Sequence, residues 1–273
     1  MTRKVHVFDN GVAVYDDHLI PAQRERYAKR NVHEAEEEDL FVRIIRALPA
    51  NGCFVNVGSA IGYYVLLAKK LSPGLVIHAV EPLERHRKYF VENIELNGFS
   101  MSDFAIHGEA IAITERAVNF TDEGYGSTIQ QRPRRNLRWM LSKFLFSRHA
   151  AKRESMKENR SAVAVVKAIT LDSLVSRIGR IVELLQMDVQ GFESDALSGG
   201  AGTLRSTQVK RFLIGTHGSE VHRECVKQLR RYNYLIEIDK AETREQPDGI
   251  LFASKAVTPM PAMEQLRQQY SRA

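Results

Sequence analysis

The sequence predicts an α/β fold built on a doubly wound, mostly parallel sheet. Apolar, strand-like runs alternate with helical patterns along most of the chain, which is typical of such a sheet. Residues 54–57 form one of these runs, and Gly58, Gly62 and a helical pattern starting at Tyr63 follow it. A strand, a glycine-bounded turn and a helix make the nucleotide-binding corner of this fold class, because the helix N-terminus offers unpaired N–H groups. The last two runs, 234–238 and 249–253, are expected to pair antiparallel.

The composition is that of one large globular domain or one domain with additions. The 273 residues are 44 % hydrophobic and 26 % charged, which is enough to bury a sizeable core. No apolar run approaches the roughly 18 residues of a membrane span, and the N-terminus lacks the apolar centre of a secretory signal. The two cysteines, Cys53 and Cys225, make no disulfide framework, so a reducing, cytoplasmic location is expected.

Residues 1–33 are expected to form a hairpin and a helix that precede the main domain. The strand-like runs 5–8 and 12–15 flank Asn10-Gly11, the signal of a type I′ hairpin turn, and residues 21–29 are expected to be helical. Asn31 and Glu34 have capping-box spacing for the next helix. We interpret the acidic run 36–38 as the solvated first turn of that helix rather than as a metal site.

The spacing of the glycines after the central strand indicates the kind of ligand. Residues 58–62 read G-x-x-x-G, and Ala60 stands where a dinucleotide fingerprint needs its middle glycine. A second strand, 75–80, ends at Glu81, whose carboxylate suits the two hydroxyls of a ribose. This combination resembles the S-adenosylmethionine site of class I methyltransferases; the alternative is a turn of purely structural use. The candidate donor-binding residues here are Asn56, Gly58, Ser59, Gly62, Tyr63 and Glu81.

The later elements continue the alternation of strands and helices. Glu109 follows the third strand, where the resemblance to class I methyltransferases makes it a candidate for facing the adenine of the donor; the alternative is an exposed glutamate in a turn. Asp172 is interpreted as the N-cap of a short helix, and Ser219 as the cap of a later one. Further strands are expected at 103–107, 110–113, 117–121, 162–168, 184–188 and 209–216, the second and third of these as a hairpin, and a helix from about residue 83.

Five stretches together resemble the FkbM-type methyltransferase family. They are FVNVGSAIGYY, HAVEP, ENIELNG, ITLDSL and LLQMDVQGFE. Their order and spacing are similar to the family's usual V-D-V-G-A-N-I-G-Y-Y, F-E-P, N-x-x-x-N-G, T-L-D and L-K-I-D-V-E-G-x-E over roughly residues 34–240. The resemblance implies a Rossmann-like class I methyltransferase fold and S-adenosylmethionine as methyl donor. It also implies O-methylation of a hydroxyl on a sugar, a glycoconjugate or glycolipid, or a secondary metabolite.

Three positions depart from the family pattern. Asn56 stands in place of an acid, and Gln186 and Gln190 stand in place of the lysine and the glutamate that flank the acid Asp188. The amide oxygen of Asn56 can still accept a hydrogen bond from the donor's ammonium group, but without a charge. The alternative function is therefore a catalytically degenerate protein that uses the methyltransferase fold for binding or assembly.

Methylation of a hydroxyl needs a base that removes its proton. Asp188 and His217 follow strands whose carboxyl ends face the ligand crevice of such a sheet, so they are candidate catalytic residues, and Asp188 is also a candidate donor contact. His222, one helical turn into the next element, is a third catalytic candidate. A divalent metal on Asp188, Glu193, His217 and His222 is the alternative, but their spacing fits no compact motif, so no metal site is expected.

The positive charge of the chain is concentrated in residues 128–160. This segment holds ten Lys or Arg and two Glu, a net +8, whereas the rest of the chain sums to −2. We expect it to be an inserted helical cap within a methyltransferase domain of residues 34–255, with a tail at 256–273. Its partner could be an anionic membrane surface, the acceptor, or a second subunit in a homodimer. Nucleic acid is disfavoured because MDVQGF replaces the Asp/Asn-Pro-Pro-aromatic signature of base methyltransferases.

Overall fold

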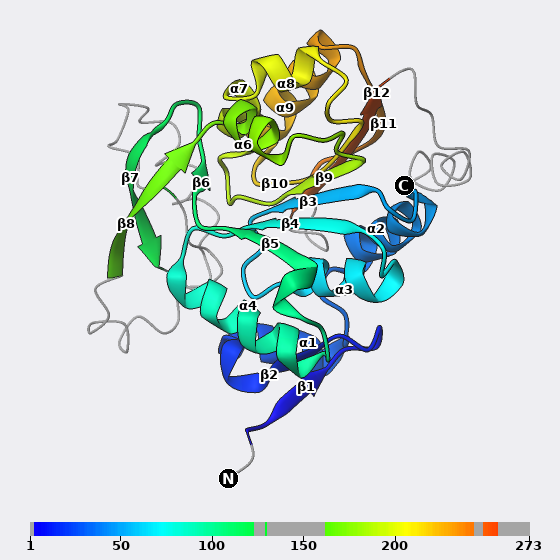
Figure 1. The fold of residues 1–273 in the computed structure, drawn as a ribbon, viewed down its shortest axis with the longest axis vertical. Helices are drawn as coiled ribbons and strands as arrows, with labels where there is room; N and C mark the ends of the chain where they lie inside the picture. Colours follow the sequence, from blue (N-terminus) through cyan, green and yellow to red (C-terminus); the bar gives the residue numbers. More distant parts are fainter. Residues whose placement is uncertain (1–2, 123–128, 130–161, 243–247, 256–273) are drawn as a thin grey trace.

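A seven-stranded sheet forms the centre of the computed structural model, which describes residues 3–122, 129, 162–242 and 248–255 (Figure 1). Five neighbouring strands, from β10 to the edge strand β5, run parallel, and β12 is antiparallel to both of its neighbours. The predicted doubly wound sheet with an antiparallel last strand is therefore confirmed. In spatial order the strands are β11 (Tyr234–Lys240), β12 (Gly249–Lys255), β10 (Arg211–Thr216), β9 (Leu184–Met187), β3 (Cys53–Val57), β4 (Val76–Val80) and β5 (Phe104–His107).

Helices cover both faces of this sheet (Figure 1). Successive residues of β3 point to opposite faces, so Phe54 packs into the core on one side, and Val55 and Val57 into the core on the other. All five residues of β3 are buried, as expected for a central parallel strand. One layer contains α2 (Ala35–Ala47), α3 (Tyr63–Leu71) and α4 (Glu84–Leu96), and the other α6 (Leu171–Ile178), α7 (Glu193–Ser198), α8 (Ala201–Arg205) and α9 (Ser219–Arg231).

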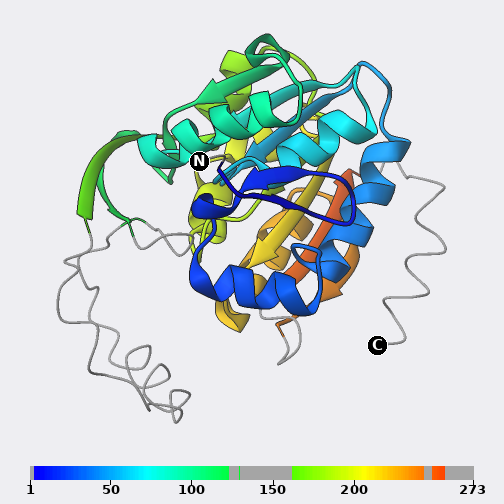
Figure 2. The same cartoon turned by 90° about the horizontal axis from the view of Figure 1, so that it is seen from below.

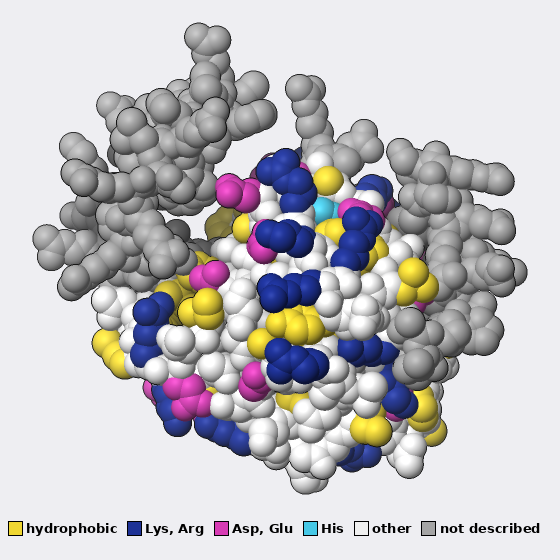
Figure 3. Space-filling view, turned by 90° about the horizontal axis from the view of Figure 1, so that it is seen from above, with side chains coloured by type: hydrophobic (Ala, Val, Ile, Leu, Met, Phe, Trp, Pro, Cys, Tyr) yellow, Lys and Arg dark blue, Asp and Glu magenta, His cyan; other side chains and the backbone are white. Residues whose placement is uncertain are grey.

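The second layer presents a basic outer surface. Helix α9 buries Cys225 and Leu229 against the sheet and exposes Arg223, Lys227 and Arg230 on its opposite side. Lys and Arg side chains are spread over this face of the molecule in Figure 3. Basic charge thus also lines a described surface, although the sequence concentrates its excess in residues 128–160.

The N-terminal segment forms the predicted hairpin and helix and packs on the main domain (Figure 2). Strands β1 (Val5–Val7) and β2 (Ala13–Tyr15) are antiparallel, and α1 (Pro21–Lys29) follows. The expected type I′ turn is wrong, because Gly11 has a positive φ and Asn10 does not. The Asn10 side chain instead accepts from Val12 N and donates to Glu38 and Tyr63, so it fastens the hairpin to α2 and α3.

The start of α2 differs from the prediction. Its N-cap is Glu34, which makes no capping bond through its side chain, so the capping box is wrong. Asn31 donates instead to the carbonyl of Val7 and to Asp9. The solvated acidic turn is also wrong for two of its three residues, since Glu37 and Glu38 are 1 % and 7 % exposed.

A second, three-stranded sheet replaces the hairpin expected at 110–121. Strand β8 (Ala162–Ile169) lies between β6 (Ala110–Ile111), to which it is parallel, and β7 (Arg116–Asp122), to which it is antiparallel. Seven consecutive residue pairs join β7 to β8. Strand β7 therefore pairs with β8 and not with β6, its expected hairpin partner.

Two cap assignments also change. Thr170 caps α6 through its hydroxyl, whereas Asp172 accepts from Gly202 N and Thr203 N at the start of α8. The N-cap of α9 is Gly218 rather than Ser219. The helical cap expected within 128–160 lies outside the described residues, apart from Ile129, and so does the tail at 256–273.

Candidate functional site

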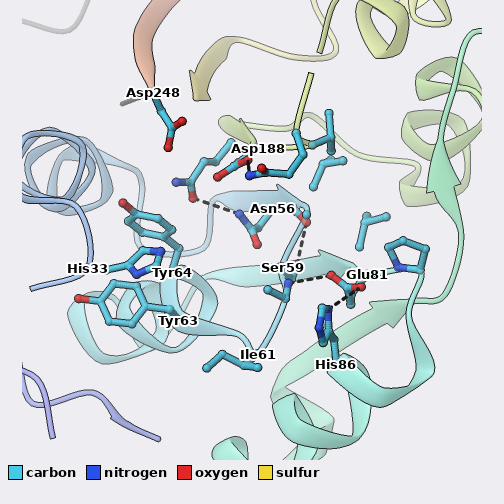
Figure 4. Close-up of a pocket in the computed structure, with 18 of the residues that line it drawn as sticks. His33, Asn56, Ser59, Ile61, Tyr63, Tyr64, Glu81, His86, Asp188 and Asp248 are labelled. Atoms are coloured by element: carbon cyan, nitrogen blue, oxygen red, sulfur yellow. Dashed lines mark hydrogen bonds and ion pairs between the residues drawn. The ribbon is translucent and has the colours of Figure 1, made fainter. Parts of the chain in front are cut away.

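A cavity of about 440 Å³ lies at the carboxyl ends of β3, β4, β9 and β10 (Figure 4). The chain order reverses between β3 and β9, and open α/β sheets bind their ligands at such a switch point. Gly62 and His222, two predicted site residues, are not part of the cavity wall. The predicted residues that line it are Asn56, Gly58, Ser59, Tyr63, Glu81, Glu109, Asp188 and His217.

The glycines after β3 are required by the protein's own packing. Gly58 has φ +91°, and a Cβ added there would lie 1.9 Å from the carbonyl oxygen of Asp188. Gly62 has φ +89°, and its Cβ would lie 2.0 Å from the ring of Phe90. Gly58 therefore brings the end of β3 against the end of β9, so the loop and Asp188 share one cavity.

Gly58→Ala is expected to unfold the protein more easily than Gly191→Ala does. Both glycines have positive φ, which costs an alanine about 1–2 kcal/mol. Only Gly58 adds a backbone clash, because nothing lies within 4 Å of the Cβ position at Gly191. Urea unfolding of the two variants measures the difference, and equal losses of stability would contradict the proposed contact between the strand ends.

Glu81 holds a fixed position on one side of the cavity (Figure 4). It follows β4 directly and is 5 % exposed. Its Oε2 accepts from Ala60 N at 2.9 Å, its Oε1 accepts from Leu83 N at 2.9 Å, and His86 Nδ1 lies 3.4 Å from Oε1. The carboxylate thereby ties the turn after β3 to the end of β4, and it keeps further lone pairs for a ligand.

The residues expected near the adenine and the turn are held by hydrogen bonds to other residues of the protein. Glu109 accepts from Arg177 Nη1 at 2.6 Å, and this pairing keeps the Glu109 pKa below its ordinary value although partial burial opposes it. Ser59 donates through its hydroxyl to the carbonyl of Asn56. The hydroxyl of Tyr63 donates to Glu38 at 2.6 Å, so Tyr63 presents its ring rather than its hydroxyl to the cavity.

The opposite side of the cavity carries a cluster of acids around one histidine. His217 Nδ1 lies 2.9 Å from Glu193 Oε1, and its Nε2 lies 3.2 Å from Asp248 and 3.6 Å from Asp188. Burial opposes the charged ring, but the bond to Glu193 and the nearby carboxylates raise the pKa of His217 to about 10. Burial raises the pKa of Asp188 to about 6. At neutral pH, His217 is therefore an imidazolium held among carboxylates.

A metal could use part of the same cluster. Asp188, Glu193 and His217 offer ligand atoms within 4.8 Å of one another. His222, the fourth candidate, lies elsewhere: its ring bonds to Thr216 Oγ1 at 2.7 Å and to Asp239 Oδ1 at 2.9 Å. The structure thus brings together three of the four candidates, with Asp248 beside them.

Sequence reasoning missed several residues of this site. Glu37 lies behind the cavity wall, where its Oε1 accepts from Gln186 Nε2 at 2.7 Å. Burial and the neighbouring Asp188 raise the Glu37 pKa to about 7. Its position was predictable, because Glu37 is three, four and seven residues before the apolar positions 40, 41 and 44 and so shares their face. The missed residues of the wall itself include His33, Glu34, Tyr64 and Asp248.

Comparison with known protein families matches residues 53–247 to the methyltransferase FkbM domain. The chain belongs to the FkbM methyltransferase family. FkbM membership and the observed sheet confirm the predicted Rossmann-like, class I methyltransferase fold.

Individual relatives of this FkbM chain are distant or partial. A protein of Jannaschia sp. (strain CCS1) named "Putative methyltransferase" is 32 % identical over 104 residues, which are 35 % of this chain and 36 % of that protein. The crystal structure of methyltransferase FkbM from Methylobacillus flagellatus KT is 14 % identical with TM-score 0.47, covering 75 % of this chain and 44 % of that one. Precorrin-6y C5,15-methyltransferase from Geobacter metallireducens GS-15 is 13 % identical with TM-score 0.49, covering 88 % and 96 %.

No helix among the described residues combines the length and the apolar character that a membrane span requires.

Proposed function

We propose that this protein is an S-adenosylmethionine-dependent methyltransferase that acts on a hydroxyl group. The observation that carries the proposal is one cavity that holds acidic side chains in two different settings. Glu81 is fixed beside the turn after β3, and Asp188 lies at the end of β9 next to His217. The proposed donor site and the proposed proton acceptor would thus share one cavity, in a chain of the FkbM family.

The residues on the Glu81 side fit the donor. A carboxylate held by two backbone N–H groups can accept from both hydroxyls of a ribose, and Glu109, proposed to face the adenine, lines the same cavity. The acidic groups on the cavity's other side suit the positive charges of the sulfonium and the ammonium. The bound donor would supply an activated methyl group, so the protein's main tasks are to orient the acceptor and remove its proton.

Asp188 is the proposed proton acceptor. With a pKa of about 6 it is mostly ionised at neutral pH yet basic enough to take a proton as the hydroxyl is methylated. His217, with a pKa of about 10, is already protonated, so its proposed role is to hold Asp188 in place. The sequence made both residues candidates for removing the acceptor's proton; in this proposal Asp188 removes the proton and His217 positions Asp188.

The acceptor is proposed to be a neutral, hydroxyl-bearing sugar or glycan. Tyr64 and His33 present ring surfaces at this side of the cavity (Figure 4). Burial raises the pKa of Glu34 well above its ordinary value, so this carboxyl tends to be neutral. The nearby acids Asp188 and Asp248, which raise that pKa further, disfavour an anionic acceptor group here. A screen of sugar and glycolipid acceptors with labelled donor tests this class, and turnover in that screen separates an enzyme from a degenerate binding protein.

Donor binding is testable before any acceptor is known. S-adenosylmethionine and S-adenosylhomocysteine are expected to raise the melting temperature, because a ligand that binds only the folded state adds RT ln(1 + [L]/Kd) to stability. NAD is expected to have no effect, since Ala60 replaces the middle glycine of a dinucleotide loop. Stabilisation by NAD and not by the methyl donor, measured by thermal shift, would reject the proposal.

Location and larger partners are proposed from the sequence and the free thiols. Cys53 and Cys225 are both unpaired and buried, which suits a reducing, cytoplasmic location. The net +8 of residues 128–160 favours an anionic partner, such as a membrane surface, to which the protein would bind peripherally. Sedimentation with anionic and neutral vesicles at low and high salt distinguishes this partner from a second subunit.

A further inference from the structure

We propose that Glu37 acts through Gln186 to orient the amide of Asn56, so that Asn56 presents its oxygen to the ammonium group of the methyl donor. Glu37 is thus a positioning residue at the back of the cavity. The inference rests on the proposed function, because it assigns a role in binding that donor. It concerns only the amino-acid end of the donor, which allows the two proposals to be tested apart.

A continuous chain of hydrogen bonds joins the three side chains. Glu37 Oε1 accepts from Gln186 Nε2 at 2.7 Å, and Gln186 Oε1 accepts from Asn56 Nδ2 at 3.1 Å. Asn56 and Gln186 are direct partners in the parallel pairing of β3 with β9. All three side chains are nearly inaccessible, with exposures of 1 % for Glu37, 1 % for Gln186 and 3 % for Asn56. Water therefore cannot readily replace one of the partners.

The Glu37 carboxylate decides which side chain donates and which accepts in each of these hydrogen bonds. An ionised carboxylate only accepts, so Gln186 must turn its NH₂ group toward Glu37 and its oxygen toward Asn56. Asn56 must then donate its own NH₂ group to Gln186. Its oxygen is left on the other side, toward the cavity, as Figure 4 shows. Among the described residues no protein group donates to this oxygen, which remains available for a cationic donor group.

The departures from the family pattern are consistent with a coupled pair. The pattern has an acid at position 56 and a lysine at position 186, and both positions carry amides here. An acid facing Gln186 would meet the glutamine oxygen, unless that glutamine turned and set its oxygen against Glu37. The two amides satisfy each other and Glu37 without a buried charge on either strand.

The test uses Glu37→Gln and two probes, S-adenosylhomocysteine and 5′-methylthioadenosine, which lacks the amino-acid end. A glutamine at position 37 can donate as well as accept, so the donor-to-acceptor direction of the hydrogen bonds from Asn56 to Gln186 and on to residue 37 is no longer fixed. We expect S-adenosylhomocysteine to bind about tenfold more weakly, the size of one charge-assisted hydrogen bond, with 5′-methylthioadenosine unchanged. Calorimetry at about pH 8.5 keeps a carboxyl of pKa about 7 ionised in the wild type. Glu36→Gln, at a half-exposed neighbour paired with Lys240, is the matched control and should change neither affinity.

The outcomes separate the hypotheses. Unchanged binding of S-adenosylhomocysteine to Glu37→Gln, or equal weakening of both probes, would overturn the orienting role. Binding of neither probe to the wild-type protein would reject the proposed function instead. A second comparison covers the case in which Glu37→Gln does not fold. Asn56→Asp alone should weaken S-adenosylhomocysteine binding, and Asn56→Asp with Gln186→Lys should restore it, because a lysine can donate to both carboxylates. Failure of this rescue would also overturn the inference.

Discussion

Asp188→Asn is expected to lower kcat about 10²–10⁴-fold, the usual contribution of a general base, while donor affinity changes little. The asparagine keeps the shape of the side chain but cannot take the acceptor's proton. Production of S-adenosylhomocysteine in the presence of the sugar acceptor measures kcat, and calorimetry measures donor affinity. Asp39→Asn, at an exposed residue of α2 paired with Arg43, is the matched control and should behave as wild type.

The same assignment predicts how the wild-type rate depends on pH. Asp188 must be ionised to accept a proton, so kcat should fall about tenfold per pH unit below its pKa of about 6. His217 loses its charge only near its pKa of about 10, so activity should hold on the alkaline side up to that region. A loss of donor affinity in Asp188→Asn as large as its loss of kcat would instead assign Asp188 to donor binding.

Glu81→Ala is expected to weaken donor binding at least about 10²-fold, because two charge-assisted bonds to the ribose hydroxyls are lost together. The substitution also leaves Ala60 N and Leu83 N without their acceptor, so the turn after β3 loses its tie to β4. Titration with S-adenosylhomocysteine measures the effect.

Two further variants serve as the control and as the intermediate case for Glu81→Ala. Glu84, an exposed acid three residues after Glu81, pairs with Lys88, and Glu84→Ala should leave donor affinity unchanged. Glu81→Gln keeps one acceptor oxygen and should lie between the wild type and the alanine variant. Full donor affinity in Glu81→Ala would show that the ribose binds elsewhere.

Sequence rules were sufficient for the central part of the fold and for some residues on each side of the site. A run such as residues 53–57, a glycine with positive φ and an amphipathic helix are each set by neighbours in the chain, so β3, α3 and the place of Glu81 were predictable. Asp188 and His217 were predictable for a different reason: each follows a strand, and the strand ends of a parallel sheet meet at one edge.

The remainder depended on contacts between distant segments. Strand β8 takes the place of a hairpin partner, and only its packing beside β6 and β7 decides that pairing. Asp248 lies beside His217, although no motif marks its position in the sequence. Glu37 is a different case. Its helical face predicted burial, but the general tendency of acids to lie in solvent outweighed that signal.

The position of β12 between β10 and β11 has a consequence for the order of folding. Strand β11 contacts the sheet through β12, yet it precedes β12 in the chain, so it has no place in the sheet until the later strand arrives. Until then β10 presents an open edge, the kind of surface on which unfinished chains aggregate. The insertion that closes this edge also carries Asp248, which immediately precedes β12, to His217. The insertion of β12 and the completion of the acidic cluster are therefore the same event, and a chain arrested before it would lack a finished cavity.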